Sequence, residues 1–140
     1  MTFDYPMAAI LAALLSLYPR SPAAQCLHAR RGAILDALDA AHRAHPEVPT
    51  ALLAAVGWHE SHLGCARASG GCWGSPRDRD HRHTAGTPTD AARDLAHALR
   101  ACGTTTGAIA RFRGGSCRPG PHTAYVARVA ALAARLGGGR

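Results

Sequence analysis

The sequence predicts a single all-α domain, and three observations support this. The chain has 140 residues, which is enough for one compact domain with a core but too few for two. Its apolar fraction of 47%, with 18% charged residues, excludes a disordered chain. Prolines and glycines divide it into segments whose apolar residues recur at helical spacing. About six helices are expected, with a long loop over residues 64–87 that could contain a small hairpin.

The helices before the long loop are expected at residues 6–18, 23–45 and 51–63. Pro19 ends the first and Pro46 follows the second, because proline cannot continue a helix. Thr50 is expected to cap the third helix, and Gly64 to end it.

The helices after the long loop are expected at residues 87–102, 105–112 and 121–136. Thr87, Pro88 and Asp90 combine a cap, a proline in the first turn and an acid three residues after the cap. A glycine-rich loop over residues 114–120 precedes the last helix.

Three regions are expected along the chain. Residues 1–22 are expected to contain a retained apolar helix, because no Lys or Arg precedes the apolar run as it would in a typical export signal. An uncleaved export signal or a surface anchor is the alternative. This helix could contact a membrane or an assembly. Residues 23–136 form the main domain, and residues 137–140 a flexible tail.

The formal charge of +7, in a chain whose 16 cations are all arginines, favours an anionic partner. Nucleic acid is not expected, because the arginines are scattered and aromatic residues are few. Cell-wall peptides and lipid surfaces remain candidates. No apolar run reaches the length of a membrane span, about 18 residues.

Five cysteines favour disulfides, with reduced buried cysteines as the alternative. The natural pairing is local, Cys65 with Cys72 and Cys102 with Cys117, which leaves Cys26 over. Disulfides would indicate an extracytoplasmic location.

Glu60 is the most informative residue. It lies in the same arc of its helix as the apolar residues Leu52, Leu53, Val56 and Leu63. A carboxyl group that loses hydration there should have a raised pKa and could act as a general acid. A glutamate that reaches solvent, or pairs with an arginine, is the alternative.

Four segments, in order, resemble the lytic transglycosylases and goose-type lysozymes of the lysozyme-like superfamily. They are the Glu60–Ser61 pair at the end of an apolar helix, residues 68–76, residues 108–115 and residues 125–129. The resemblance covers residues 30–136 and implies a lysozyme-like helical fold, Glu60 as the catalytic residue and peptidoglycan glycan strands as the partner. It implies that the substrate contacts five residues: Ser61, Trp73, Phe112, Arg113 and Tyr125.

The chain departs from the family pattern at two places. Gly74 replaces a glutamine, and Phe112 with Arg113 replaces tyrosine with asparagine. Phe112 could stack on a sugar, and Arg113 could pair with a substrate carboxylate.

The resemblance implies cleavage of the MurNAc–GlcNAc β-1,4 bond, with protonation of the bridging oxygen by Glu60. In a transglycosylase the muramyl 6-hydroxyl then attacks and leaves a 1,6-anhydro end. In a hydrolase a second carboxyl group directs water. Asp78, Asp80 and Asp90 are the candidates for that group, although the first two lie among arginines and could belong to a solvated loop. One-carboxylate chemistry is preferred.

A metal site is the other chemical hypothesis, since His59, His62, Cys65 and Cys72 cluster in the sequence. Neither a His-Glu-x-x-His motif nor a Cys-x-x-Cys pair is present, so no metal and no cofactor is expected. Two alternatives to an active wall-cleaving enzyme remain. One is a lysozyme-like domain of a phage or bacterial envelope that binds wall glycan without turnover, and the other is a helical adaptor.

Overall fold

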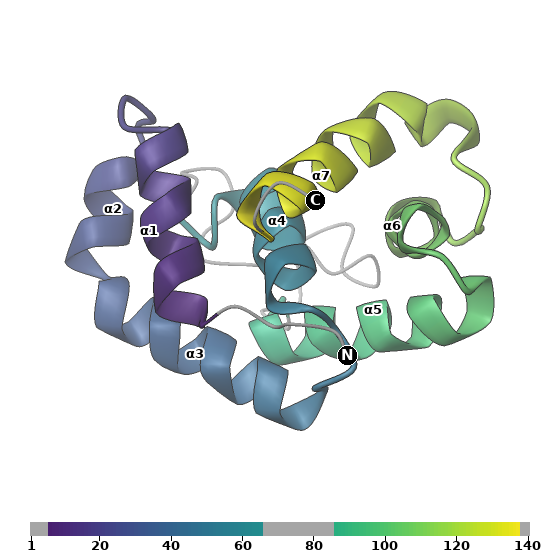
Figure 1. The fold of residues 1–140 in the computed structure, drawn as a ribbon, viewed down its shortest axis with the longest axis horizontal. Coiled ribbons are helices and arrows are strands. Elements are labelled where there is room, and N and C mark those ends of the chain that lie inside the picture. The colour runs from purple at the N-terminus through teal and green to yellow at the C-terminus, as the bar shows by residue number, and fades with distance from the viewer. Residues whose placement is uncertain (1–5, 66–85, 138–140) are drawn as a thin grey trace.

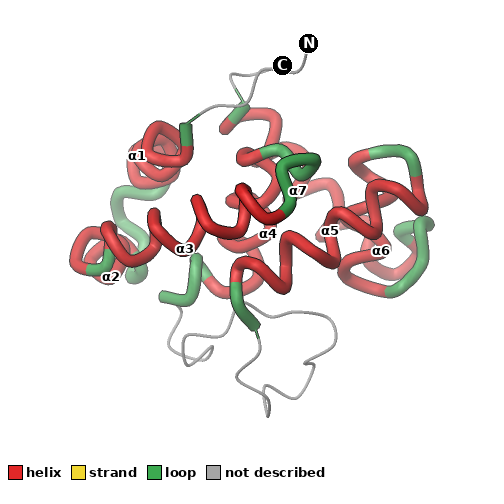
Figure 2. Tube along the Cα trace, turned by 90° about the horizontal axis from the view of Figure 1, so that it is seen from below, coloured by secondary structure: helices red, strands yellow, loops and turns green. Residues whose placement is uncertain are grey.

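The computed structural model of the chain describes residues 6–65 and 86–137 and confirms the all-α prediction, since these residues contain no strand (Figure 2). The described helices are α1 (Met7–Leu17), α2 (Ala24–Ala29), α3 (Arg31–Ala44), α4 (Thr50–Ser61), α5 (Pro88–Cys102), α6 (Thr105–Gly114), the 3₁₀ turn η3 (Gly120–His122) and α7 (Thr123–Leu136). The hairpin considered for the long loop lies outside the described residues.

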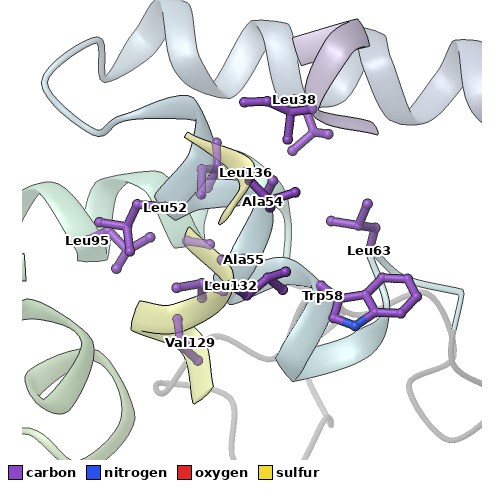
Figure 3. Packing of buried hydrophobic residues seen from close by; sticks show 14 of the residues in the cluster. Leu38, Leu52, Ala54, Ala55, Trp58, Leu63, Leu95, Val129, Leu132 and Leu136 are labelled. Carbon is purple, nitrogen blue, oxygen red and sulfur yellow. The ribbon is translucent and has the colours of Figure 1, made fainter. Parts of the chain in front are cut away.

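Helix α4 lies at the centre of the molecule, with α1, α2 and α3 to one side and α5 and α6 to the other (Figure 1). It packs against α1, α5 and α7. Every residue from Leu52 to Trp58 is buried, so the helix is enclosed on all sides and not only along the predicted apolar arc. Figure 3 shows side chains of α4 beside others from α3, α5 and α7: Leu38, Leu95, Val129, Leu132 and Leu136.

Helix α1 contributes to this same core. Its apolar stripe of Met7, Ile10, Leu11 and Leu14 is buried, and the helix packs against α3, α4 and α7. None of the described helices combines the length and apolar character required to cross a bilayer.

The helix predicted over residues 23–45 is two helices, which is a correction. The chain turns at Arg30, whose φ of −105° and ψ of 15° leave the helical region. Leu27 and Ile34 are nevertheless both buried. Because these residues are two helical turns apart, the apolar repeat continues across the turn and the sequence pattern does not reveal it.

Helix α4 also begins and ends differently from the prediction. Pro49 and not Thr50 occupies the N-cap position, and Thr50 is the first helical residue. The helix ends at Ser61, because His62 and Leu63 both have positive φ. The start of α5 is as predicted: the Asp90 N–H donates to Oγ1 of Thr87 over 3.1 Å.

Disulfides join Cys26 to Cys65 and Cys102 to Cys117. The second pair is as predicted, but the local pairing of Cys65 with Cys72 is wrong. Helix α2 brings Cys26 to the turn after α4, where the Cα atoms of Cys26 and Cys65 are 5.8 Å apart. Because Cys65 is bonded to Cys26, it does not pair with Cys72. Two disulfides point to an oxidising, extracytoplasmic environment.

Candidate active site

Glu60 lies in the last turn of α4, where the central helix reaches the edge of the core. Its side chain is only 8% exposed, and the residue as a whole is half-buried. The α4 backbone is enclosed by α1, α5 and α7, so the carboxyl group is held by a rigid element. A catalytic group benefits from such placement.

A left-handed turn follows Glu60. His62, Leu63 and Gly64 have φ values of 49°, 58° and 83°. This backbone conformation is unfavourable for the two residues that carry side chains. Leu63 is buried at 2% exposure, and its N–H donates to the Gly57 carbonyl over 3.0 Å. Core packing and this hydrogen bond therefore stabilise the turn.

Ser61 stabilises the same turn from inside. Its hydroxyl accepts a hydrogen bond from the Gly64 N–H at 2.9 Å and lies 3.4 Å from the Gly57 carbonyl, to which it donates. The residue is 2% exposed. In this structure Ser61 therefore shapes the backbone after Glu60 and does not present its hydroxyl to a ligand.

An aromatic stack covers one side of this helix end. The Tyr18 and Trp58 rings are stacked with centroids 4.8 Å apart, and the His62 ring is tilted against Trp58 at 4.5 Å. Offset and tilted ring pairs are favourable arrangements. The stack links the segment after α1 to α4 and orients His62.

Glu60, Arg113 and Tyr125 come together from α4, α6 and α7. Nη1 of Arg113 lies 3.1 Å from Oε2 of Glu60 and donates to it. The guanidinium carbon also lies 5.0 Å from the centre of the Tyr125 ring, a cation–π arrangement. These three residues are far apart in the sequence, and the fold brings them together.

The electrostatics of the site depend on this cluster. Burial, and next the negative charge of Glu60, raise the pKa of the Tyr125 phenol far above its usual range. Its hydroxyl meets no partner at hydrogen-bond geometry among the described residues, although Glu60 is near enough to act on it. Tyr125 is therefore a neutral phenol at working pH.

His59 lies one position before Glu60 and is partly buried. Burial lowers the pKa of its ring, and the positive charge of Arg128 and the His62 ring lower it further. His59 is thus a neutral imidazole near neutral pH. Arg128, on α7, was not among the predicted site residues; its spacing of three from Tyr125 on one helix is the signal that could have identified it.

Two effects oppose each other at Glu60. Loss of hydration favours the protonated acid, as the sequence predicts, whereas a guanidinium 3.1 Å away favours the carboxylate. The arginine-paired glutamate considered as the alternative is therefore observed.

The remaining predicted residues have different positions. Phe112 is 2% exposed and packs in the core, so the prediction that it stacks on a sugar is wrong for this structure. Asp90 lies in the first turn of α5, where its Oδ1 is 3.3 Å from Nη1 of Arg93. Both belong to the fold and neither belongs to the cluster around Glu60.

Several predicted residues lie outside the described part of the chain: Cys72, Trp73, Gly74, Asp78 and Asp80. Within the described residues, no group of three or more His, Cys, Asp and Glu side chains is arranged to hold a metal ion. Cys65, a member of the metal cluster considered from the sequence, is instead bonded to Cys26.

Comparison of the chain with protein-family models, with curated proteins and with solved structures finds no match.

Proposed function

We propose that the protein is a peptidoglycan-cleaving muramidase that acts on the MurNAc–GlcNAc β-1,4 bond as a lytic transglycosylase, with Glu60 as its single catalytic carboxyl group. One observation carries the proposal: Glu60, Arg113 and Tyr125 meet at one place. The proposed catalytic role of Glu60 and the proposed substrate contacts of Arg113 and Tyr125 require these residues to lie together, and their convergence supports the proposal.

In the proposed reaction, protonated Glu60 donates its proton to the bridging glycosidic oxygen. Charge develops on the ring as the bond breaks, and the carboxylate that remains stabilises this oxocarbenium-like state. The same carboxylate then takes a proton from the muramyl 6-hydroxyl as that hydroxyl attacks the anomeric carbon. The products are a 1,6-anhydro end and a new non-reducing end.

The hydrolytic outcome requires a second carboxyl group about 6.5–9.5 Å from the first. Asp90 is paired with Arg93 in the first turn of α5, which supports a structural role. Asp78 and Asp80, outside the described residues, remain the candidates for a hydrolase. One-carboxylate chemistry uses only groups that the cluster around Glu60 supplies.

A lysozyme-like domain that binds wall glycan without cleaving it is the second candidate, and a specific contact favours it. Arg113 neutralises the proposed acid, and Phe112, which replaces a polar residue of the family pattern, is buried in the core. A domain that had lost turnover would retain this pair as a structural contact. Either function places the protein in the periplasm, at the cell surface or in a virion that acts on a host wall.

The test is digestion of purified peptidoglycan, followed by mass spectrometry of the soluble products. Anhydro-muramyl ends are expected, reducing ends would indicate a hydrolase, and the absence of products would favour the binding domain. Glu60→Gln should reduce turnover by at least about 10²–10⁴-fold, because an amide cannot transfer the proton.

The chain offers a matched control, since Glu47 is its other glutamate. Glu47 is also paired with an arginine, with Oε1 3.1 Å from Nη1 of Arg100, but its side chain is 42% exposed. Glu47→Gln should retain wild-type turnover. Equal activity of Glu60→Gln and Glu47→Gln would contradict the assignment of Glu60.

A further inference from the structure

Arg113 belongs to a part of the chain that has no acidic residues. Residues 95–140 contain seven arginines and no aspartate or glutamate. The arginines of α6 and α7 that the structure describes are all exposed: Arg111, Arg113, Arg128 and Arg135. A surface of one sign attracts ligands of the opposite sign and concentrates them near the site. The part of the chain that Arg113 belongs to therefore has only positive charges to offer an anionic ligand.

The two partners of the Glu60–Arg113 pair differ in accessibility. The Glu60 side chain is 8% exposed and that of Arg113 is 46% exposed. A ligand that arrives from solvent therefore reaches the guanidinium before it reaches the carboxyl group. The guanidinium has five N–H donors in a plane, which suits a carboxylate better than an ammonium group does.

The Tyr125 ring holds the guanidinium in place. The 5.0 Å separation between the guanidinium carbon and the ring centre means that Arg113 can exchange one carboxylate for another without leaving this support. An exchange of partners then loses little side-chain entropy, since the arginine is already ordered.

We propose that the Glu60–Arg113 ion pair, called the latch below, breaks when a carboxylate of the glycan strand binds Arg113. The substrate carboxylate binds the guanidinium in place of Glu60, and Glu60 thereby becomes able to take up the proton that it donates. This inference rests on the proposed muramidase function and specifies its substrate as a glycan strand with carboxylate groups. Arg113 is thus a specificity residue as well as a positioning residue.

One arginine–carboxylate pair breaks and another forms, so the number of ion pairs does not change. Glu60 then takes up one proton from the solvent, which raises the charge of the complex by one, and it passes this proton to the glycosidic oxygen. The charged and titratable groups that face the site from the described elements are His59 on α4, His62 directly after α4, Arg113 on α6, and Tyr125 and Arg128 on α7. The cations among them attract the strand, and only the Arg113 contact is exchanged.

The first test measures cleavage of two substrates by Arg113→Gln. On peptide-free glycan strands, whose muramyl residues have lactyl carboxylates, kcat/KM should fall about 10- to 100-fold, the loss expected for a charge-assisted contact. On neutral N-acetylglucosamine oligomers kcat/KM of this variant should rise, since the variant has no Glu60–Arg113 ion pair to break. Arg111→Gln removes the same charge from an exposed position of the same helix and should leave the ratio of the two activities unchanged.

A change in both activities by the same factor would overturn the latch. Strands that retain their peptides distinguish the source of the carboxylate, because their lactyl groups are bound in amides. A preference for these strands that depends on Arg113 would identify peptide carboxylates as the ligand, and a preference for peptide-free strands would identify the lactyl group.

The second test measures binding alone, so that it remains decisive if no cleavage occurs. Glu60→Gln should bind peptide-free strands about 10- to 100-fold more tightly than Glu60→Gln with Arg113→Gln, and the difference should diminish with salt. Glu60→Gln with Arg111→Gln is the control. Equal affinity of all three variants would overturn the inference. A wild type without any lytic activity would contradict the proposed function, and this binding comparison would still test whether Arg113 binds a carboxylate of the strand.

Discussion

Cys26 and Cys65 are joined by a disulfide that holds the end of α4 against α2. Cys65 directly follows the left-handed turn that begins after Ser61. The bond therefore fixes the far end of the backbone that positions Glu60. The second disulfide, Cys102–Cys117, connects the end of α5 to the loop after α6.

Peptide mapping without reduction should recover the Cys26–Cys65 and Cys102–Cys117 linkages. These close loops of 39 and 15 residues, which the chain-entropy estimate converts to about 4 and about 3 kcal/mol of stability. Cys26→Ser should therefore lower the free energy of unfolding more than Cys102→Ser does. A Cys65–Cys72 linkage in the map would contradict the structure.

From the sequence, Glu60, Arg113 and Tyr125 were expected to act on one substrate, and Glu60 paired with an arginine was an alternative, but the sequence did not show which arginine that would be. The partner of a long side chain depends on tertiary packing, which the order of segments along a chain does not show. Phe112 illustrates this limit: it is adjacent to Arg113, and neighbours on a helix point about 100° apart. One of the two had to face the core, and the pattern did not show which.

The fold shows the same division between local and tertiary information. The start of α5 was predictable, because its cap is a local interaction between Thr87 and Asp90. The turn at Arg30 and the partner of Cys65 were not, because both depend on how α2 lies against α3 and α4. A local rule favours the cysteine nearest in the sequence, whereas the tertiary fold brings Cys65 to Cys26, 39 residues away.

Ser61→Ala should lower the free energy of unfolding by about 1 kcal/mol, since it removes the buried hydroxyl that bonds to Gly57 and Gly64. Ser16→Ala, on the exposed side of α1, should have almost no effect, as urea unfolding of both variants would show. Glycan affinity should be the same for Glu60→Gln and for the double variant Glu60→Gln with Ser61→Ala. Loss of affinity without loss of stability would instead identify Ser61 as a substrate ligand.

Tyr125 should remain protonated at pH values where a solvated phenol ionises, because burial and the charge of Glu60 raise its pKa. The wild type and Tyr125→Phe should therefore have the same increase in absorbance at 295 nm up to about pH 10–11. In urea the extra phenol of the wild type should ionise near pH 10. A difference between the folded proteins near pH 10 would show that the Tyr125 ring is solvated.

His59 should make stability depend on pH in one definite direction. Its folded-state pKa is lowered from the usual 6.5, so above pH 6.5 the ring is neutral in both states and contributes nothing. As the pH falls below 6.5, the unfolded chain takes up the proton first, and the free energy of unfolding decreases until the pH passes the lower folded-state value. One such group contributes at most about 1.4 kcal/mol per pH unit.

Denaturant unfolding of wild type and His59→Gln at pH values from 7.5 to about 5 should show a smaller decrease in the free energy of unfolding for the variant. The control His97→Gln, at an exposed position of α5, should retain the wild-type pH dependence. Identical curves for His59→Gln and wild type would mean that the ring is hydrated in the folded protein, and that the surface next to Glu60 is open to water.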